Sequence, residues 1–356
     1  MLTSLSLAQE SGAAHFCNVA AHALGLDPAG HARRFDDAIL VETPLPWRRT
    51  LYERAGALPQ EMIDLLALWL ARYRQGQPYS HCPLLIAPDP ATSRPGFRRV
   101  IFFRRPPGAF AHYTRAEYFV PEEEAGPLAW ALYEAQGQLP RFDAYRLPEA
   151  PVGSPVRDLL VCTHGAVDAA CGKFGYPLYR SLRDAPADAE PGALRVWRVS
   201  HFGGHVFAPT LLELPSGHFW AFVGDEQGAQ IARRSGDAAA LRGHYRGWAG
   251  AEDGFAQAAE CAAWQREGWA WFDYAKSCTV TALDSAGAAA TANGDADAPA
   301  PRWAEVRLDF TRPDGTRGAY AARVEAAPPV HTQPHTGRAD AYAYPQYAVT
   351  RFEKCR

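Results

Sequence analysis

The stretch that decides the fold reads RDLLVCTHGAVDAAC over residues 157–171, and a second stretch reads LRVWRVSHFGGH over residues 194–205. Each begins with an apolar run typical of a buried strand and ends in a glycine-bearing segment that carries two metal-ligating side chains. Strands of an α/β layer release their following loops at one edge, so we expect both pairs of side chains to meet there. Residues 175–183 are predicted to form the helix between the two strands.

The four side chains are Cys162, Cys171, His201 and His205. Two thiolates and two imidazoles suit zinc or an iron-sulfur cluster better than magnesium or calcium, which prefer oxygen ligands. Eight residues separate the two cysteines, whereas structural zinc hairpins usually place them about two to four residues apart. The spacing favours a group larger than one ion, with zinc as the alternative. Gly203 and Gly204 disfavour a helix between the histidines and favour a tight loop.

The chain before this stretch carries a similar order of elements. Strands are expected at 38–42, 83–87 and 99–103, and a helix at 58–73, from their apolar periodicity. We therefore predict two related α/β units, of which only the second has ligands. A proline-rich passage at 147–155 is the expected boundary, which gives an N-terminal unit over 1–150 and a ligand-bearing unit over 151–225.

Residues 226–356 have a different character and are expected to form an α+β extension. A helix is predicted at 254–274 and strands at 280–283, 303–310 and 319–324, the last two joined by a turn at Pro313-Asp314-Gly315. Residues 284–301 are rich in Ala, Gly, Asp and Thr and cannot bury much apolar surface. This segment is expected to be a mobile surface loop.

The composition excludes several classes of protein. The 36 basic and 39 acidic residues give a net charge of -3 without long blocks of one sign, which argues against a nucleic-acid partner. No run approaches the ~18 apolar residues of a membrane helix, and the start lacks the pattern of a signal peptide. We expect a cytoplasmic protein without membrane insertion. Its 7 cysteines form an odd, scattered set, which argues against a disulfide framework.

Other potential ligands are assigned to simpler roles. His164 lies between the ligand cysteines and is expected to stay outside the ligand set, although it is the first substitute for either histidine. The segment 331–335, with a histidine at each end, is expected to be a polar loop that could bind a stray metal. The remaining cysteines are expected to be packing or surface residues, namely Cys17, Cys82, Cys261, Cys278 and Cys355.

The pattern Cys-x8-Cys, a short α/β interval and His-x-Gly-Gly-His resembles the sucrase/ferredoxin-like family of thioredoxin-like ferredoxins. Surrounding residues agree, among them His164-Gly165, Asp168 and Gly172. The resemblance implies that Cys162 and Cys171 hold one iron of a 2Fe-2S cluster, and that His201 and His205 hold the other. It also implies a thioredoxin-like fold for this unit. No pair of carboxylates stands out for the glycoside chemistry that the word sucrase suggests.

The resemblance implies an electron carrier more than a catalyst, exchanging electrons with a redox protein that the sequence does not identify. Replacing two thiolates by two neutral imidazoles removes two negative charges and eases reduction. In Rieske centres the potential is roughly -150 to +300 mV, against about -400 mV in plant-type ferredoxins. The second ring nitrogen of each imidazole couples electron uptake to proton uptake. The alternatives are a zinc-stabilised binding module and a redox enzyme with an unidentified substrate.

Overall fold

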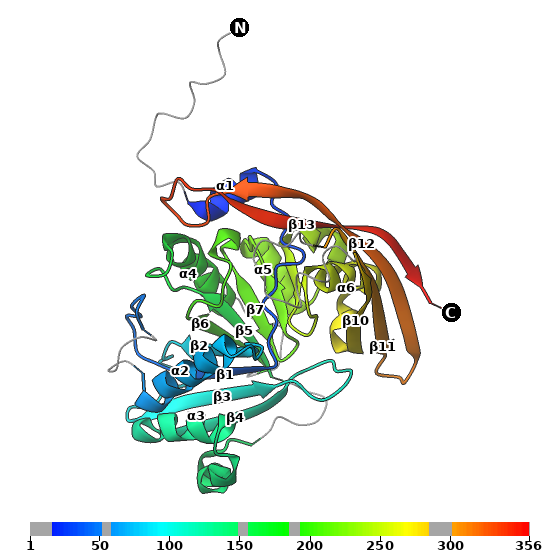
Figure 1. The fold of residues 1–356 in the computed structure, drawn as a ribbon. Helices are drawn as coiled ribbons and strands as arrows, with labels where there is room; N and C mark the ends of the chain where they lie inside the picture. The colour runs from blue at the N-terminus through cyan, green and yellow to red at the C-terminus, as the bar shows by residue number, and fades with distance from the viewer. Residues whose placement is uncertain (1–15, 52–57, 149–155, 185–192, 285–300, 356) are drawn as a thin grey trace, which may run out of the picture.

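The computed structural model describes residues 16–51, 58–148, 156–184, 193–284 and 301–355. Within these ranges the strands form one mixed sheet of nine strands and one antiparallel sheet of four (Figure 1). The prediction of an α/β protein is confirmed. All but the two end residues of the expected mobile loop at 284–301, and most of the expected boundary at 147–155, lie outside the described residues. The domain limits therefore stay a prediction.

The first half of the large sheet contains the predicted strands and one more. β1 is buried along its whole length, which fits its continuous apolar run. β4 was missed because its first residues are polar and partly exposed, so no clear alternation marks it. The elements are α1 (Cys17–Ala23), β1 (Asp37–Glu42), α2 (Gln60–Arg74), β2 (His81–Ile86), β3 (Phe97–Arg104), β4 (Thr114–Pro121), α3 (Ala125–Tyr133) and the 3-10 helices η1 (Glu122–Glu124) and η2 (Gln136–Tyr145).

The second half begins with the strand that ends at Cys162. β5 and β6 appear where the sequence predicts them, and β9 adds a ninth strand from beyond residue 225. The elements are β5 (Arg157–Cys162), α4 (Ala169–Asp184), β6 (Leu194–Val199), η3 (His205–Phe207), β7 (Leu211–Leu214), β8 (His218–Trp220), α5 (Asp225–Arg233), η4 (Ala238–His244) and β9 (Tyr245–Trp248).

The two halves of the sheet have one strand order. In the first half, β1 pairs with β2 in parallel and with β3 antiparallel, and β3 pairs with β4. In the second half, β5 pairs in the same way with β6 and β7, and β7 pairs with β8. Helices α2 and α4 occupy the corresponding crossovers. The halves meet where β2 and β6 pair antiparallel, Ile86 opposite Val199. This agreement is what two related units predict.

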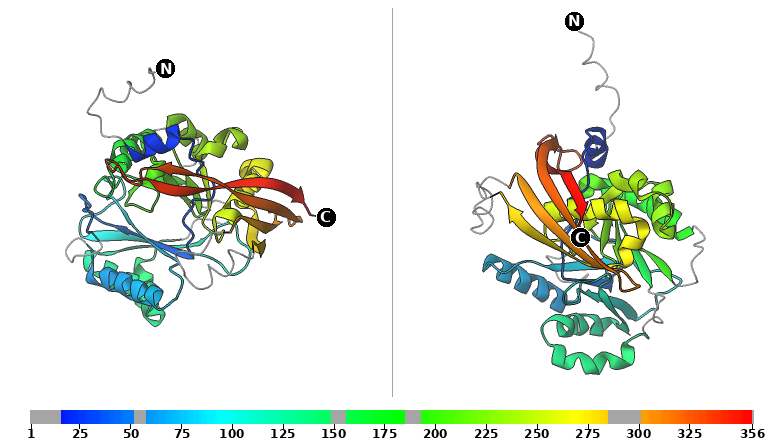
Figure 2. Two further views of the ribbon diagram at one scale, coloured as in Figure 1. Left: turned by 45° about the horizontal axis from the view of Figure 1, so that its top comes forward. Right: turned by 90° about the vertical axis from the view of Figure 1, so that its right-hand side faces the viewer.

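The C-terminal part forms the second sheet, which packs on helix α6 (Figure 2). The helix predicted at 254–274 is wrong in its second part: α6 (Gly254–Glu267) ends because Gly268 adopts a φ of +67°, and a 3-10 helix, η5 (Gly268–Asp273), follows. The last strand, β13, was not predicted. The strands are β10 (Ala275–Leu283), β11 (Trp303–Thr311), β12 (Arg317–Thr332) and β13 (Tyr342–Lys354).

Helix α1 and the tip of the β12–β13 hairpin lie together beside the second half of the large sheet. The β12–β13 hairpin extends along the top of the molecule to α1 in Figure 1. Val330 and Tyr344 of this hairpin pack with Ala21 of α1 against Val206 and Phe207, which follow His205. Helix α1 and this hairpin therefore cover one of the predicted ligand loops. Among the described helices, none is long and apolar enough to span a lipid bilayer.

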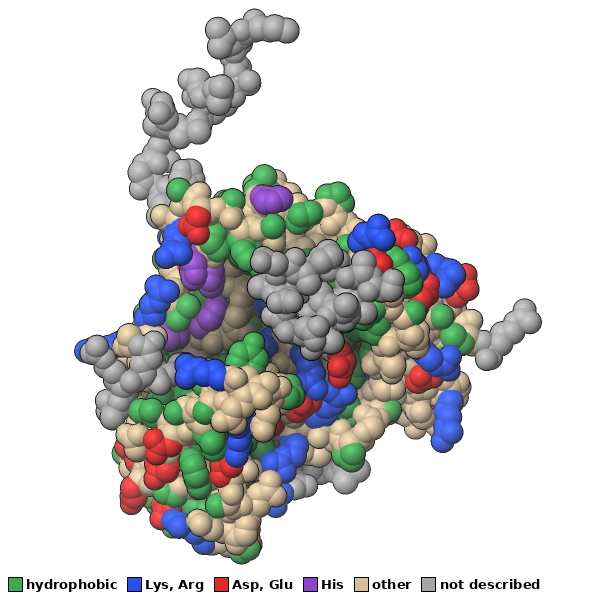
Figure 3. All heavy atoms as spheres, viewed as in Figure 1, with side chains coloured by type: hydrophobic (Ala, Val, Ile, Leu, Met, Phe, Trp, Pro, Cys, Tyr) green, Lys and Arg blue, Asp and Glu red, His purple; other side chains and the backbone are tan. Residues whose placement is uncertain are grey.

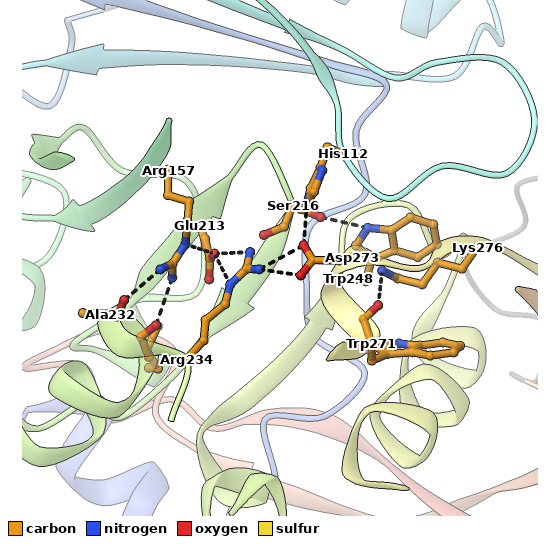
Figure 4. A network of polar contacts seen from close by, with 11 residues as sticks. His112, Arg157, Glu213, Ser216, Ala232, Arg234, Trp248, Trp271, Asp273 and Lys276 are labelled. Carbon is orange, nitrogen blue, oxygen red and sulfur yellow. Dashed lines mark hydrogen bonds and ion pairs between the residues drawn. The ribbon is translucent and has the colours of Figure 1, made fainter. Parts of the chain in front are cut away.

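A buried carboxylate on strand β7 connects several elements through hydrogen bonds and ion pairs (Figure 4). Glu213 is fully buried and accepts hydrogen bonds of 2.8 Å from both Arg157 and Arg234. Arg157 also donates to the carbonyl of Ala232, and Arg234 pairs with Asp273 at 3.0 Å. Burial opposes the charge of Glu213, but the two guanidinium groups outweigh it and hold its pKa at about 2. The carboxylate thus links β5, β7, α5 and η5.

Replacing Glu213 with Gln should lower the free energy of unfolding at pH 7 by about 3–5 kcal/mol, because it removes the buried counter-charge of Arg157 and one of the two carboxylate partners of Arg234. The folded pKa lies below the ordinary value of 4.5. The stabilisation is therefore complete above that value and is lost as the pH falls towards about 2. Urea unfolding at pH 7 and at about pH 3 should show a smaller loss at the lower pH.

The exposed Glu353→Gln serves as the control and should change stability by less than about 0.5 kcal/mol. An equal loss for Glu213→Gln at both pH values would contradict the ionic role of this side chain.

Candidate metal centre

The two predicted ligand loops leave neighbouring strands at the same edge of the sheet. β5 and β6 are parallel, and Cys162, the last residue of β5, lies opposite Val199, two residues before His201. The amide of Thr163 continues this pairing by donating to the carbonyl of Val199 at 3.1 Å. The expectation that strand order brings the loops together is confirmed.

Cys171 lies on the first turn of α4 instead of in a loop, which corrects the helix start predicted at residue 175. Asp168 caps this turn, since its carboxylate accepts a 2.9 Å hydrogen bond from the amide of Ala170. Gly175 lets the helix approach β5 closely, because a side chain there would collide with the carbonyl oxygen of Cys162. This helix start was hard to predict from the sequence, because Gly172, Gly175 and Pro177 all disfavour helix.

Three of the four predicted ligands surround one point. His201 Nδ1 lies 3.7 Å from the sulfur of Cys162 and 3.7 Å from that of Cys171, and both thiols are almost completely buried. Metal–ligand bonds of about 2.0–2.3 Å in a tetrahedral site place neighbouring ligand atoms roughly 3.5 Å apart. These three donor atoms are therefore spaced to hold a metal ion between them.

The two thiols do not ionise alike. Burial opposes ionisation of Cys162, but hydrogen bonds from Cys171 and His201 outweigh it and hold its pKa well below the usual value. The same hydrogen bond keeps the proton on Cys171 and, with burial, raises the pKa of that thiol. Cys162 is thus the thiol that ionises more readily, and a metal bound by both sulfurs must displace the proton of Cys171.

His205 belongs to a neighbouring group. Its ring centroid lies 5.4 Å from that of His201, while its Nδ1 lies 3.5 Å from the sulfur of Cys17 and 3.5 Å from the Asp168 carboxylate. The loop before it turns tightly, as predicted, with φ of +98° at Gly203 and +77° at Gly204. Cys17, Asp168 and His205 lie close enough together to form a second potential metal-binding group.

The hairpin tip between β12 and β13 completes the surroundings of His205. The ring of His335 stacks on that of His205 with centroids 4.4 Å apart. Thr336 donates to Asp168 twice, from its hydroxyl at 2.6 Å and from its amide at 2.9 Å. A chain segment more than 160 residues away in the sequence therefore holds the carboxylate that faces His205.

These groups set the charge around His205. Burial lowers the pKa of His205 to about 4, and repulsion from His201, His335 and Arg49 adds to the effect, although Asp168 opposes it. Burial also disfavours the charge of Asp168, but hydrogen bonds from Thr336 and Ala170 outweigh it and lower the pKa of that carboxyl. His205 is therefore a neutral imidazole at neutral pH, the form that binds metals.

The sequence did not reveal the roles of Cys17 and His335. Cys17 was assigned to packing and His335 to a polar loop, because no local spacing relates either residue to the ligand loops. His164 is buried at 3% exposure, donates no ligand atom to either group, and accepts a long 3.4 Å contact from the amide of His201. It belongs to neither potential metal-binding group, and its exclusion from the ligand set stays a prediction. The thiols of Cys82, Cys261, Cys278 and Cys355 lie in neither metal-binding group.

Fold and site together define a mixed α/β protein with possible Cys/His metal-binding groups at one sheet edge. The family model described as Sucrase/ferredoxin-like matches residues 28–247, and the chain belongs to this family. No curated protein and no solved structure matches the chain. Cys17 and the hairpin tip lie outside the matched range, at opposite ends of the chain.

Titration of the metal-free protein with Co²⁺ should produce thiolate-to-cobalt charge-transfer absorption, because Cys162, Cys171 and His201 converge on one point. Cys171→Ser should lose about half of this absorption, since one of two thiolate ligands is removed. The matched control is Cys261→Ser, which replaces a buried thiol away from the site and should leave the spectrum unchanged. Full absorption in Cys171→Ser would remove that residue from the site.

Proposed function

We propose that this protein transfers electrons by means of one 2Fe-2S cluster held by Cys162, Cys171, His201 and His205. The observation that supports this most strongly is the meeting of two buried thiols and two imidazoles at one sheet edge, in a member of a ferredoxin-like family. When bound, such a cluster supplies reversible one-electron chemistry. The protein is an electron carrier in this proposal, and no substrate pocket is assigned to it.

The residues at the site fit a cluster in the chemistry of their donor atoms. Thiolates and imidazoles are the ligands that iron-sulfur clusters use, and imidazole ligation favours a comparatively high potential. Asp168 faces one ring nitrogen of His205 and leaves the other for a metal, an arrangement that orients metal-bound histidines in other proteins. Cys162 and Cys171 supply the negative charge, while His201 and His205 supply the groups that exchange a proton.

Zinc is the second candidate, and one observation favours it. The 3.7 Å distances from His201 to both thiols suit three ligands of a single tetrahedral ion. Cys17 or His205 lies nearby and could supply the fourth ligand. A zinc site would make this protein a metal-stabilised binding module without a redox role.

We further propose that the partner is a redox protein with an acidic surface. The exposed residues Arg48, Arg49 and Lys173 flank the ligand loops, and none of them has an acidic partner within the described part of the chain. Arg49 is close enough to repel a proton from His205. Histidine side chains gather in a hollow of this face with Lys or Arg side chains beside them (Figure 3). Opposite charges would steer such a partner to this edge.

Anaerobic preparation with iron, zinc and acid-labile sulfide analysis decides between the two candidates. The proposal expects about two irons and two sulfides per chain and a Rieske-like electron paramagnetic resonance signal after reduction. One zinc without sulfide would overturn the cluster and support the binding module.

Replacing His205 with Cys should lower the reduction potential and weaken its dependence on pH, because a charged thiolate replaces a neutral ring that can exchange a proton. Potentiometric titration at several pH values measures both effects. The control is His331→Cys, an exposed position, which should leave potential and pH dependence unchanged. An unaltered titration of His205→Cys would exclude this histidine as a ligand.

Asp168→Asn keeps the size of the side chain and removes its charge, and should weaken metal retention by about 10- to 100-fold, the usual effect of losing a carboxylate that orients a ligand histidine. Thr336→Val removes the hydroxyl donor to Asp168 and should act in the same direction but more weakly. Competition with a chelator measures both losses. Asp225→Asn, at an exposed helix end, is the control, and equal retention in Asp168→Asn and this control would refute the orienting role.

A further inference from the structure

The edge of the first half of the sheet carries a counterpart of the ligand site. The amide of Thr43 donates to the carbonyl of Ile86, just as the amide of Thr163 donates to that of Val199. Where the two halves of the sheet meet, the amide of Ala87 donates to the carbonyl of Arg198, and the amide of Ser200 donates to the carbonyl of Leu85. Glu42, the last residue of β1, therefore occupies the place that Cys162 occupies at the end of β5.

A pocket of about 440 Å³ opens at this counterpart position. Its volume lies within the range of small-molecule sites, about 300–1,000 Å³. It is lined by carboxyl groups, guanidinium groups, a hydroxyl group and an apolar wall of proline rings and Phe97. The polar lining residues are Glu42, Asp89, Ser93, Arg94, Arg98 and Glu122, of which Glu42 is the buried carboxyl group. Both signs of charge and an apolar surface thus face one small space.

Several charged atoms of this pocket lack hydrogen-bond partners in the described part of the chain, although Ser93 hydrogen-bonds to the carboxyl group of Glu42. Glu42 is 4% exposed, and its Oε2 accepts no hydrogen bond there. Nε and Nη1 of Arg98 are likewise buried without acceptors, and its remaining nitrogen lies 3.8 Å from Glu122. Burying a charged atom without a hydrogen bond costs several kcal/mol. These atoms therefore gain most from a ligand that supplies both a donor and an acceptor.

Arg94 is the second cation at the mouth of the pocket. Its guanidinium group lies over the rings of Phe97 and Phe119, 5.0 and 5.3 Å from their centroids. It has no carboxylate partner within the described residues, so its edge is free to bind an anion. A carboxylate suits two neighbouring guanidinium groups because each can donate two parallel hydrogen bonds.

We propose that this pocket binds a small zwitterion of the α-amino acid type. Its ammonium group would pair with Glu42, its carboxylate with Arg98 and Arg94, and an apolar side chain would lie against the prolines and Phe97. An anion alone would leave Oε2 of Glu42 without a donor, and a cation alone would leave Nε and Nη1 of Arg98 without an acceptor. The inference does not depend on the metal at the other edge of the sheet.

Isothermal titration of the full chain with L-leucine, L-serine and L-glutamate tests the site with three different side chains. At least one should bind more tightly than about 1 mM, which corresponds to about -4 kcal/mol. With L-leucine as the expected ligand, N-acetyl-L-leucine lacks the ammonium charge and L-leucinamide lacks the carboxylate. Each should bind about tenfold more weakly or worse, the cost of losing a charged hydrogen bond.

Glu42→Gln and Arg98→Met should each weaken binding of the amino acid about tenfold or more. Glu123→Gln lies on the neighbouring helix η1, does not line the pocket, and should bind as the parent does. Circular dichroism establishes that the variants are folded. The proposal is overturned if none of the three amino acids binds, or if binding survives both pocket substitutions. Metal and sulfide content, measured on the same samples, reports on the proposed electron transfer independently.

Discussion

The parallel pairing of β5 with β6 is the constraint on which the rest of the site depends. It places Cys162 opposite Val199, so that both ligand loops begin at the same edge of the sheet. The absence of a side chain at Gly175 then lets α4 lie against the end of β5, which brings Cys171 to the same point. A slip of one residue in this register would turn Cys162 to the opposite face of the sheet and separate it from Cys171.

Much of this arrangement was readable in the sequence because its signals are local. The apolar runs at 157–161 and 194–199 predicted β5 and β6, and their order predicted that Cys162 and His201 meet. The start of α4 was missed because Asp168 supplies a cap that outweighs the poor helix propensity of Gly172 and Gly175. Cys17 and Thr336 lie 319 residues apart, yet both contact Asp168. Only tertiary packing brings them there, and no periodicity encodes it.

The contacts of Asp168 explain why both ends of the chain matter to a site in its middle. The carboxylate caps α4 beside Cys171, faces His205 and is held by Thr336. One side chain thus connects the helix that carries a thiol with the loop that carries an imidazole. The β12–β13 hairpin also covers that loop through Val330 and Tyr344. Cys17, Thr336 and the β12–β13 hairpin lie outside the family match at 28–247, so the surroundings of His205 include residues beyond the part of the chain that the family model covers.

The junction of β2 with β6 relates the two edges of the sheet to each other. Glu42 pairs with Ile86, Ile86 lies opposite Val199, and Val199 pairs with Cys162. Three strand spacings of ~4.8 Å place the backbones of Glu42 and Cys162 about 14 Å apart. The same backbone geometry therefore offers two sites with opposite chemistry. At one, two thiols and an imidazole lie close enough together to hold a metal ion. At the other, the buried carboxyl group of Glu42 and the guanidinium groups of Arg94 and Arg98 face an open pocket. The two edges therefore share one backbone arrangement and differ in the side chains that line it.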